Sequence, residues 1–455
     1  MTIESAAPIR PFDRKRYYSA YVIAILVLVN ALAYLDRQVM LILVEPIQGD
    51  LGLSDTQMGI IIGPAFMAFF LAAAMPMGAL ADRHARNRLL AAGITIWSVA
   101  TLWAGRSDSF GELALARACV GFGEACVVPA VFSLVTDYVS PERRGRAMAV
   151  VTTGVPIGAG FALFGGGLIL QWASNNDVRF PLLGATQPWE VVLILFGLSG
   201  LVVALLTLTI AEPRQATQAV ETAQRETAAQ PAAAPATESF LAYLRTRPGA
   251  TAIILIPYVL LGYIQIATFS WVPTLLMRLH GLAHAETGII VGTVTVVIPI
   301  ITSLIAGTAA DYLFRRFAAG PFLIVVWIGP LILPGVLLIA LSPGVTGVVA
   351  GLVLACAVGG AASTTVYVAL QAVTATPFRG RKLALYNMLL QVTGLGAGPL
   401  IVAAITDYVF QDRAMLHLAI LVAVIPAWIA AVYCGFAGRK SYEQLRQRIS
   451  LQDRG

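Results

Sequence analysis

The chain has 455 residues, of which 58% are hydrophobic and only 12% are charged, and its mean hydropathy is +0.80. This composition excludes a soluble protein of ordinary kind and predicts an all-α protein that crosses a membrane many times. The formal net charge of +6 does not indicate a nucleic-acid surface, because the basic residues are distributed by side of the membrane rather than in one patch.

Runs of about 20 apolar residues predict the membrane-spanning helices. The sequence contains twelve such runs, at 18–44, 56–80, 89–105, 112–138, 146–172, 189–210, 250–276, 286–310, 320–341, 345–374, 383–409 and 414–436. The first run is too long for a cleavable signal peptide and no small-residue cleavage site follows it, so we expect the first span itself to direct insertion.

Lysine and arginine are strongly biased to one side of these spans. Of the 30 basic residues, 24 lie at the two ends of the chain or in the even-numbered gaps between spans, four lie on the opposite side and two lie within spans. A bias of this strength places both termini in the cytoplasm. No N-x-[ST] sequon occurs in the chain, which is compatible with our expectation of a bacterial inner membrane.

The first and fourth spans carry ionisable residues where lipid is expected. Asp36 lies toward the outer half of the first span, and Arg117 and Glu124 lie two helical turns apart on the fourth. An ionisable residue at the centre of a span costs roughly 2.5–3.5 kcal/mol, so such groups normally face partners or a water-filled path. Asp36, Arg117 and Glu124 are therefore candidates for proton coupling, and a purely structural clamp between packed helices is the alternative.

Other polar residues in the spans are candidates for substrate binding. Tyr34, Asn30 and Arg37 share one face of the first span. The C-terminal half has no charge buried as deeply, but three of its spans repeat uncharged polar or aromatic residues at helical spacing, which suits a mostly apolar ligand held by a few hydrogen bonds. Contacts between helices are the alternative for these stripes, which comprise Tyr258, Gln265, Phe269, Tyr367, Gln371, Asn387 and Gln391.

Two loops share a pattern in which glycine, aspartate and arginine follow one another at intervals of four. A second pair of loops shares an Arg-Gly-Arg sequence, beginning at Arg144 and at Arg379. The two offsets, 229 and 235, agree closely, so the chain is interpreted as two parallel six-span repeats. We assign to a gate near the cytoplasm Gly78, Asp82, Arg83, Arg86, Asp137, Arg144, Asp311 and Arg315.

The segment between the repeats changes abruptly to alanine, glutamine, threonine, glutamate and proline, which is typical of a linker. The predicted organisation is a cytoplasmic N-terminus (1–17), an N-terminal bundle (18–211), a cytoplasmic linker (212–249), a C-terminal bundle (250–437) and a basic cytoplasmic tail (438–455).

Several of these residues resemble the motifs of a known family. The Gly78–Arg88 loop resembles the loop signature of the major facilitator superfamily, although Ala85 and Asn87 replace a usual glycine and basic residue, and Arg117 with Gly121 resembles its fourth-span signature. Tyr34-Leu35-Asp36-Arg37 and the Arg117–Ala125 stretch resemble the spinster-type subfamily, with organic-anion symporters of sugar acids as near relatives. The resemblance implies twelve helices in two bundles, alternating access, proton coupling at Asp36 and Glu124, and lipid-like substrates.

The sequence thus predicts a secondary transporter, with no enzyme activity, that moves a small amphiphilic solute with protons. Phe66, Phe69, Phe70 and Trp271 are expected to supply apolar area for it. A sugar-acid symporter, anchored by Arg37 or Arg117, and a transporter-like membrane sensor are the alternatives. We expect no cofactor other than the coupling proton, no metal, no nucleic-acid partner, membrane lipids and a small-molecule substrate as partners, and a monomer.

Overall fold

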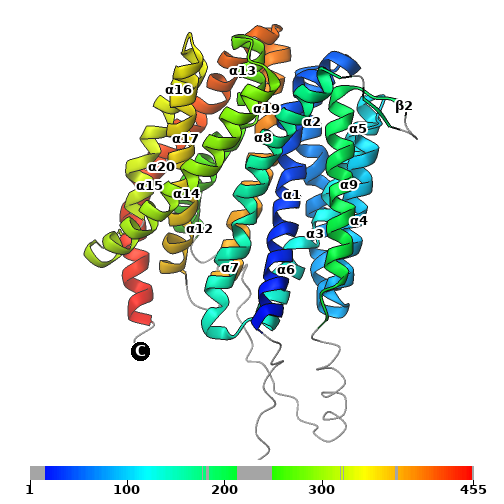
Figure 1. The fold of residues 1–455 in the computed structure, drawn as a ribbon. Coiled ribbons are helices and arrows are strands. Elements are labelled where there is room, and N and C mark those ends of the chain that lie inside the picture. Colours follow the sequence, from blue (N-terminus) through cyan, green and yellow to red (C-terminus); the bar gives the residue numbers. More distant parts are fainter. Residues whose placement is uncertain are drawn as a thin grey trace, which may run out of the picture.

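The structure, a computed structural model, describes residues 16–176, 178–180, 184–212, 248–317, 319–320, 322–374 and 378–452. The predicted N-terminal segment and the predicted linker lie largely outside this described part of the chain, and so does the side chain of Asp311. The face at which the first helix begins and the last helix ends is called the terminal face, and the opposite face is called the distal face (Figure 1).

The N-terminal half contains six spans, several of which are broken at glycine or proline. Its elements are α1 (Arg16–Leu51), α2 (Asp55–Ile62), α3 (Pro64–Arg83), α4 (Arg86–Ala104), α5 (Phe110–Glu124), α6 (Val127–Tyr138), η1 (Pro141–Arg143), α7 (Arg144–Thr152), α8 (Gly154–Ser174), the strands β1 (Arg179–Phe180) and β2 (Gly184–Ala185), and α9 (Pro188–Leu208). The pairs α2–α3, α5–α6 and α7–α8 each form one span. The short antiparallel β1–β2 hairpin was not predicted.

The C-terminal half repeats this arrangement. Its elements are α12 (Pro248–Phe269), α13 (Val272–His280), α14 (His284–Arg316), α15 (Phe322–Ile328), η2 (Gly329–Leu331), α16 (Ile332–Leu341), α17 (Val345–Ala372), α18 (Arg379–Leu390), the π-helical η4 (Gln391–Ala397), α19 (Gly398–Ala404), the π-helical η5 (Ile405–Phe410), η6 (Arg413–Met415) and α20 (Leu416–Gln452). The last helix extends far into the predicted tail.

Eleven of these segments are long and apolar enough to cross a membrane. The twelfth is α4, which begins with two arginines and an asparagine and is therefore less apolar, but packs between α5 and α9 as a full span. Only helices satisfy every backbone group within a single spanning segment. The fold is accordingly an all-α bundle of twelve spans in two six-span halves, as predicted.

The internal repeat extends to matching hydrogen bonds. Arg144 Nε donates to the Val139 carbonyl over 3.2 Å, and Arg379 Nε donates to the Thr374 carbonyl over 3.2 Å. In both halves an arginine at the start of a helix thus binds a carbonyl five residues earlier. This explains why the Arg-Gly-Arg sequence recurs, and it gives Arg144, a predicted gate residue, a local structural contact.

The halves meet along α8 and α14, which lie side by side. Glycines allow the close approach, because a Cβ atom at Gly160 would lie 2.0 Å from Val296 Cγ2 and one at Gly167 would lie 2.6 Å from the His284 carbonyl oxygen. Small residues commonly permit such contacts in membranes, where packing replaces the hydrophobic effect as the force between helices.

A methyl group should be poorly tolerated at Gly121 of α5, which packs closely against α3. A Cβ atom there would lie 2.2 Å from the backbone oxygen of Phe66 on α3. Gly121→Ala should therefore lower the free energy of unfolding by about 1–3 kcal/mol, the usual range for overpacking. Gly111→Ala on the same helix meets nothing within 4 Å, so thermal unfolding in detergent should leave this control at or slightly above the wild type. Equal midpoints for the two variants would contradict the close α3–α5 contact.

Candidate functional site

A buried cluster of four charged residues lies where α1 and α5 face each other. Asp36, Arg37, Arg117 and Glu124 are brought together, and none of them faces lipid, since all but Arg37 are fully buried and the Arg37 side chain is only 9% exposed. Two positive and two negative side chains are present, so the cluster can be electrically neutral. Buried charges are tolerated when they are paired in this way.

The ion pairing within the cluster involves an arginine that the sequence assigned to another role. Arg37, a predicted substrate-binding residue, forms the direct ion pair with Glu124, with 2.6 Å between Nε and Oε2. Arg117 instead donates from Nη1 to the backbone oxygen of Asp36 over 3.0 Å. The Asp36 carboxylate is turned toward α4, where the Thr101 hydroxyl lies 3.4 Å away. The arrangement follows from the helix geometry, because Asp36 and Arg37 leave α1 about 100° apart.

Aromatic rings surround the Arg37 guanidinium. Its Cζ lies 5.1, 5.0 and 4.9 Å from the ring centroids of Tyr34, Phe66 and Phe70, and Arg117 Cζ lies 5.4 Å from Phe66. Cation–π contacts of this kind stabilise a guanidinium that has lost its water. Phe66 is fully buried in this cluster, so its predicted contact with an amphiphile is wrong for this conformation.

The cluster is not fully satisfied by hydrogen bonds. Among the described residues, neither Glu124 Oε1 nor Arg117 Nε has a hydrogen-bond partner. A carboxylate oxygen with no donor facing it is able to accept a proton, and protonation would remove the charge that holds Arg37. The geometry thus allows one proton to change the ion pairing at the centre of the N-terminal half.

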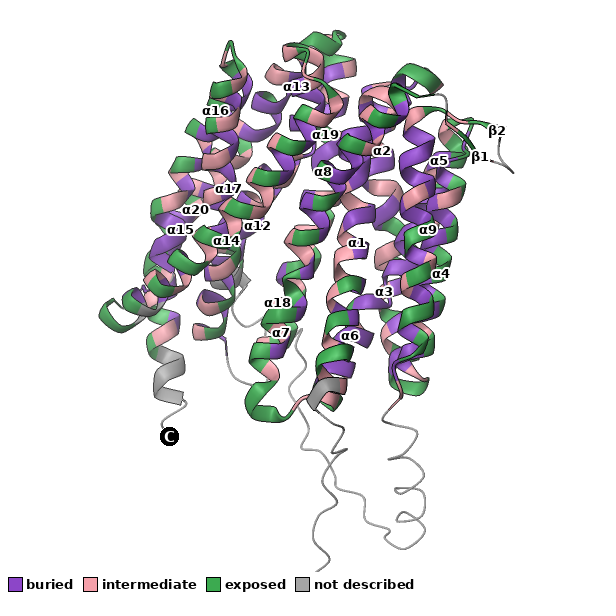
Figure 2. Cartoon of the chain, in the orientation of Figure 1, coloured by how far each residue is buried: buried purple, intermediate pink, exposed green. Residues whose placement is uncertain are grey.

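Some predicted binding residues of the C-terminal half are accessible. Tyr367 and Gln371 of α17 and Asn387 of α18 are exposed, and the Tyr367 hydroxyl lies 3.5 Å from Asn387 Oδ1. Figure 2 shows α7 largely exposed near the terminal face. Tyr367, Gln371 and Asn387 therefore remain candidates for substrate binding.

Other residues of the same stripes have packing roles. Gln265 lies against α17, since a Cβ atom at Gly359 would be 2.0 Å from Gln265 Nε2, while Phe269 and Gln391 are half-buried. Half-buried Asn30 donates from Nδ2 to the Leu26 carbonyl of its own helix over 3.0 Å.

The predictions for two aromatic residues, Tyr258 and Trp271, are corrected by the structure. Tyr258 is 1% exposed and contacts Phe322 of α15 within the C-terminal half, with ring centroids 6.1 Å apart. Trp271 is fully buried and donates to the Pro399 carbonyl over 3.1 Å. Their predicted contacts with substrate are wrong for this conformation. Helical spacing places Tyr258 on the same face as Gln265, but neighbouring helices of the same half cover that part of the face.

At the terminal face, Arg86 organises the predicted gate. Its fully buried guanidinium lies 2.5 Å from Asp137 Oδ2, donates to Ser133 Oγ over 2.7 Å and pairs with Glu212, whose other oxygen accepts from the Arg86 backbone N–H. Glu212, the first residue of the predicted linker, is thus held against the N-terminal half. These contacts lie within one half. The other predicted gate residues are half-buried (Gly78) or exposed (Asp82, Arg83 and Arg315), and Asp311 has no described side chain.

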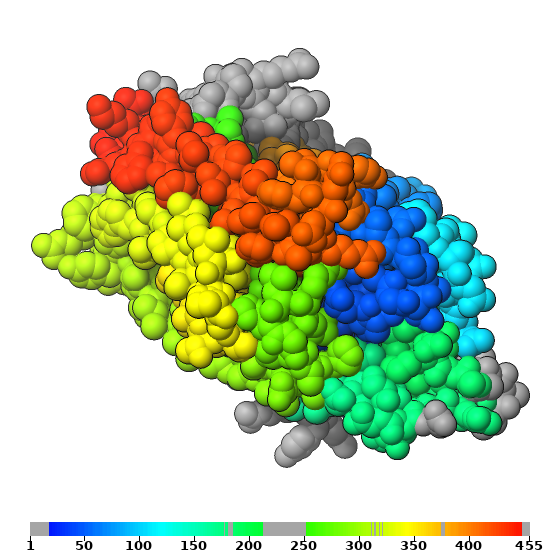
Figure 3. All heavy atoms as spheres, turned by 90° about the horizontal axis from the view of Figure 1, so that it is seen from above, coloured from blue at the N-terminus to red at the C-terminus, as the bar shows by residue number. Residues whose placement is uncertain are grey.

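A polar contact that the sequence did not predict joins the halves at the distal face. Arg278 of α13 reaches Asp55 through two hydrogen bonds of 2.9 Å, Glu45 over 2.7 Å and Gln48 over 3.1 Å. We call Arg278, Asp55, Glu45 and Gln48 the distal latch. Figure 3 shows the blue segment of the N-terminal half directly against the orange and green segments of the C-terminal half on this face.

Two further hydrogen bonds support the latch. Arg413 Nη2 donates to the Leu53 carbonyl over 2.7 Å, and the Thr56 backbone N–H donates to Asp407 Oδ2 over 2.6 Å. Asp55 also stands in the first turn of α2, where the helix dipole favours a negative charge. The halves are thus held together at the distal face. Across the part of the chain that the structure describes, no group of His, Cys, Asp and Glu has a metal-binding arrangement.

The sequence matches a known family and several of its members. Residues 26–399 match the model of the Major Facilitator Superfamily. An MFS-type efflux pump of Mycolicibacterium smegmatis is 30% identical over 419 residues, which cover 90% of this chain and 92% of that protein. Protein spinster homolog 1 of Homo sapiens is 28% identical over 198 residues, 43% of this chain and 35% of that protein.

Solved structures show the same fold. A bacterial homolog of the human lysosomal transporter spinster, in an inward-facing and occupied conformation, has a TM-score of 0.75 at 22% identity and covers 97% of this chain and 99% of that chain. A D-xylose–proton symporter has a TM-score of 0.63 at 14% identity and covers 91% and 97%. The chain therefore belongs to the major facilitator superfamily and is a membrane transporter rather than an enzyme.

Proposed function

We propose that this protein is a proton-coupled carrier that moves an amphiphilic organic solute by alternating access, with Glu124 and Asp36 as the proton-responsive groups. The observation that carries the proposal is the Arg37–Glu124 ion pair, which is buried and has an unsatisfied carboxylate oxygen. Protonation of Glu124 releases Arg37 from its partner. A proton can shift the balance between two conformations only through its different affinity for each, and a pair that re-forms in one of them provides that difference.

The orientation belongs to the proposal as well. Basic residues accumulate on the terminal face, which the positive-inside rule assigns to the cytoplasm. With the distal latch closed, the conformation described here is then open toward the cytoplasm. The carrier is proposed to act as a monomer in a bacterial inner membrane, and the name of its full-length mycobacterial relative favours export as the direction of transport.

An amphiphile suits the accessible side chains of α3, α17 and α18. Phe69 of α3 and Met388 of α18 are about half exposed, and the accessible polar groups of the C-terminal half, at Tyr367, Gln371 and Asn387, are uncharged. Such side chains bind a mostly apolar solute and orient it through a few hydrogen bonds.

The first test measures proton movement in liposomes that contain the purified protein and a pH-sensitive dye. Addition of a lysophospholipid should produce a proton flux with the wild type, and Glu124→Gln or Asp36→Asn should reduce it at least about a hundred-fold, the lower range for loss of a group that transfers protons. Glu112→Gln, an exposed carboxylate on the same helix as Glu124, is the control. A proton flux equal to that of the wild type in both variants would overturn the assignment of the proton-responsive groups.

A sugar-acid symporter is the second candidate, because protonation of Glu124 would leave the Arg37 guanidinium available for an organic anion. Against it, both arginines of the cluster are engaged in this conformation. Thermal-shift measurements with a lysophospholipid panel and a sugar-acid panel separate the two: stabilisation by sugar acids alone would favour the symporter. Counterflow of the labelled ligand that stabilises the protein then separates a carrier from a sensor, which would bind without exchange.

A further inference from the structure

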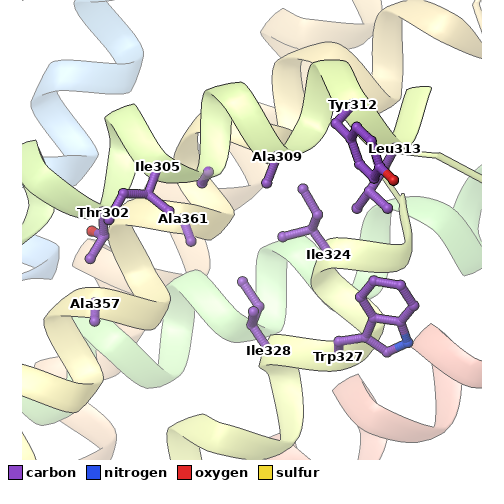
Figure 4. A pocket seen from close by; sticks show the side chains of 11 residues that line it. Thr302, Ile305, Ala309, Tyr312, Leu313, Ile324, Trp327, Ile328, Ala357 and Ala361 are labelled. Carbon is purple, nitrogen blue, oxygen red and sulfur yellow. The ribbon is translucent and has the colours of Figure 1, made fainter. Parts of the chain in front are cut away.

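An apolar groove lies on the flank of the C-terminal half, between α14, α15 and α17. It encloses about 440 Å³, and its lining includes Ile305, Tyr312, Ile324, Trp327 and Ala361 (Figure 4). The hydroxyl of Thr302, which also lines the groove, already donates to the Ile298 carbonyl over 2.9 Å. The groove thus presents hydrocarbon and aromatic surface to any occupant. None of its residues belongs to the charged cluster or to the distal latch.

The groove opens on the outside of the bundle, at membrane depth. Ile305, Tyr312 and Trp327 are 62%, 58% and 55% exposed. Ile305 and Trp327 lie in spans, where such surface meets lipid, and Tyr312 follows the end of the first of these spans by two residues. Along α14 the groove runs from Thr302 to Leu313. At 1.5 Å per residue this is about 16 Å, close to half of the roughly 30 Å hydrocarbon core of a bilayer. Its length therefore corresponds to one acyl chain in one leaflet.

Arginines stand at the terminal-face end of the groove. Arg315 and Arg316 are exposed and follow Leu313 closely on α14. Arg316 Nη1 donates to the Tyr312 hydroxyl over 2.7 Å, and Arg446 of α20 donates to the Phe317 carbonyl over 2.8 Å. Arg315, Arg316 and Arg446 thus lie near the residue at which α14 ends. Guanidinium groups bind phosphate through paired N–H donors, so this end of α14 suits an anionic head group.

We propose that this groove is a binding site for an anionic phospholipid of the leaflet at the terminal face. One acyl chain lies between α14 and α15, over α17, and the phosphate is held by Arg315 and Arg316, with Arg446 beside them. The match between a groove one acyl chain long and a cluster of arginines at its end selects an anionic lipid over a zwitterionic one. Each basic residue near an anionic lipid surface favours the anionic lipid about five-fold, so two of them are sufficient for a preference of at least about ten-fold.

The position of Trp327 in the groove provides a direct readout. The full-length protein in detergent is titrated with phosphatidylglycerol or phosphatidylcholine carrying the same brominated acyl chains, which quench nearby tryptophan fluorescence. The difference between the wild type and Trp327→Phe isolates the signal of this residue. We expect phosphatidylglycerol to quench Trp327 at a roughly ten-fold lower concentration than phosphatidylcholine, and the double variant Arg315→Gln/Arg316→Gln to remove this preference.

Two controls separate the head group from the acyl chain. Arg439→Gln/Lys440→Gln removes two basic residues from α20 at the same face and should leave the preference unchanged. Ala309→Phe fills the groove and should weaken quenching by both lipids, while thermal unfolding confirms that it is folded. Equal curves for the two lipids in the wild type, or an unchanged preference in Arg315→Gln/Arg316→Gln, would overturn the proposal. A dimer by light scattering that Ala309→Phe dissociates would assign the groove to a second copy of the chain instead.

Discussion

Replacing Arg278 with alanine is expected to move the carrier toward conformations that are open at the distal face. Arg278 is the residue through which α13 contacts Asp55, Glu45 and Gln48 of the other half, and Asp55 is fully buried. Removing one partner of a buried, hydrogen-bonded charge pair costs about 2–5 kcal/mol. The lower limit corresponds to a roughly 30-fold change in the ratio of closed to open molecules. Each half should stay folded, because the lost contacts of Arg278 lie between the halves and not within one of them.

Distances between spin labels across the distal face measure this change directly. Gly49→Cys on α1 and Ala414→Cys beside α20 place labels on the two halves, because a Cβ atom at Gly49 meets nothing within 4 Å and Ala414 is exposed. The four native cysteines are replaced beforehand. Arg278→Ala should add a population at longer distance. Arg106→Ala is the matched control, since Arg106 pairs with Glu190 at the same face but within one half, with 2.9 Å between Nη1 and Oε2. Identical distance distributions for both variants would show that the latch does not hold the halves together.

The sequence could not reveal the distal latch, because its partners are far apart in the chain. Arg278 is separated from Glu45 by 233 positions and from Asp55 by 223. In the sequence each of them is an isolated charge near the outer end of a span, which is where solvated charges are expected. Only the docking of one half on the other brings these residues together.

The spans and the repeat, in contrast, could be predicted, since both depend on local pattern. A run of about 20 apolar residues can cross the bilayer only as a helix, and the Arg-Gly-Arg sequence recurs because it serves the same local hydrogen bond in each half. The depth of Asp36, Arg117 and Glu124 could also be predicted from their places in the spans. Which arginine meets which carboxylate depends on the rotation of α1 against α5, and spacing along one helix does not determine that rotation.

The other large effect is expected at the Arg37–Glu124 pair. Glu124→Leu leaves a neutral residue facing a buried guanidinium and gives the cluster a net positive charge. Breaking a buried pair by removing one partner costs about 3–5 kcal/mol, whereas replacing both partners with apolar residues is often nearly neutral. The free energy of unfolding should therefore fall in Glu124→Leu and in Arg37→Met, and should recover in the double variant. Denaturant titration in detergent measures all four proteins.

These four proteins form a double-mutant cycle, and a second double-mutant cycle identifies the partner of Glu124. Arg117 carries the same charge in the same cluster but donates to the Asp36 carbonyl, so Arg117→Met combined with Glu124→Leu should recover less stability than Arg37→Met does. Residues in direct contact show coupling energies of about 0.5–3 kcal/mol. Equal coupling in both cycles would mean that Glu124 responds to net charge alone and not to a specific ion pair.

The double variant Arg37→Met/Glu124→Leu also decides between the two roles of the pair. If Arg37 and Glu124 only clamp α1 against α5, apolar replacements that restore stability should restore pH-dependent transport as well. If Glu124 receives the coupling proton, the double variant should be as stable as the wild type and yet show no proton flux in liposomes, because no apolar side chain can bind a proton. The double variant therefore distinguishes an effect on the free energy of unfolding from an effect on proton coupling. A proton flux equal to that of the wild type would show that the Arg37–Glu124 pair has a structural role only.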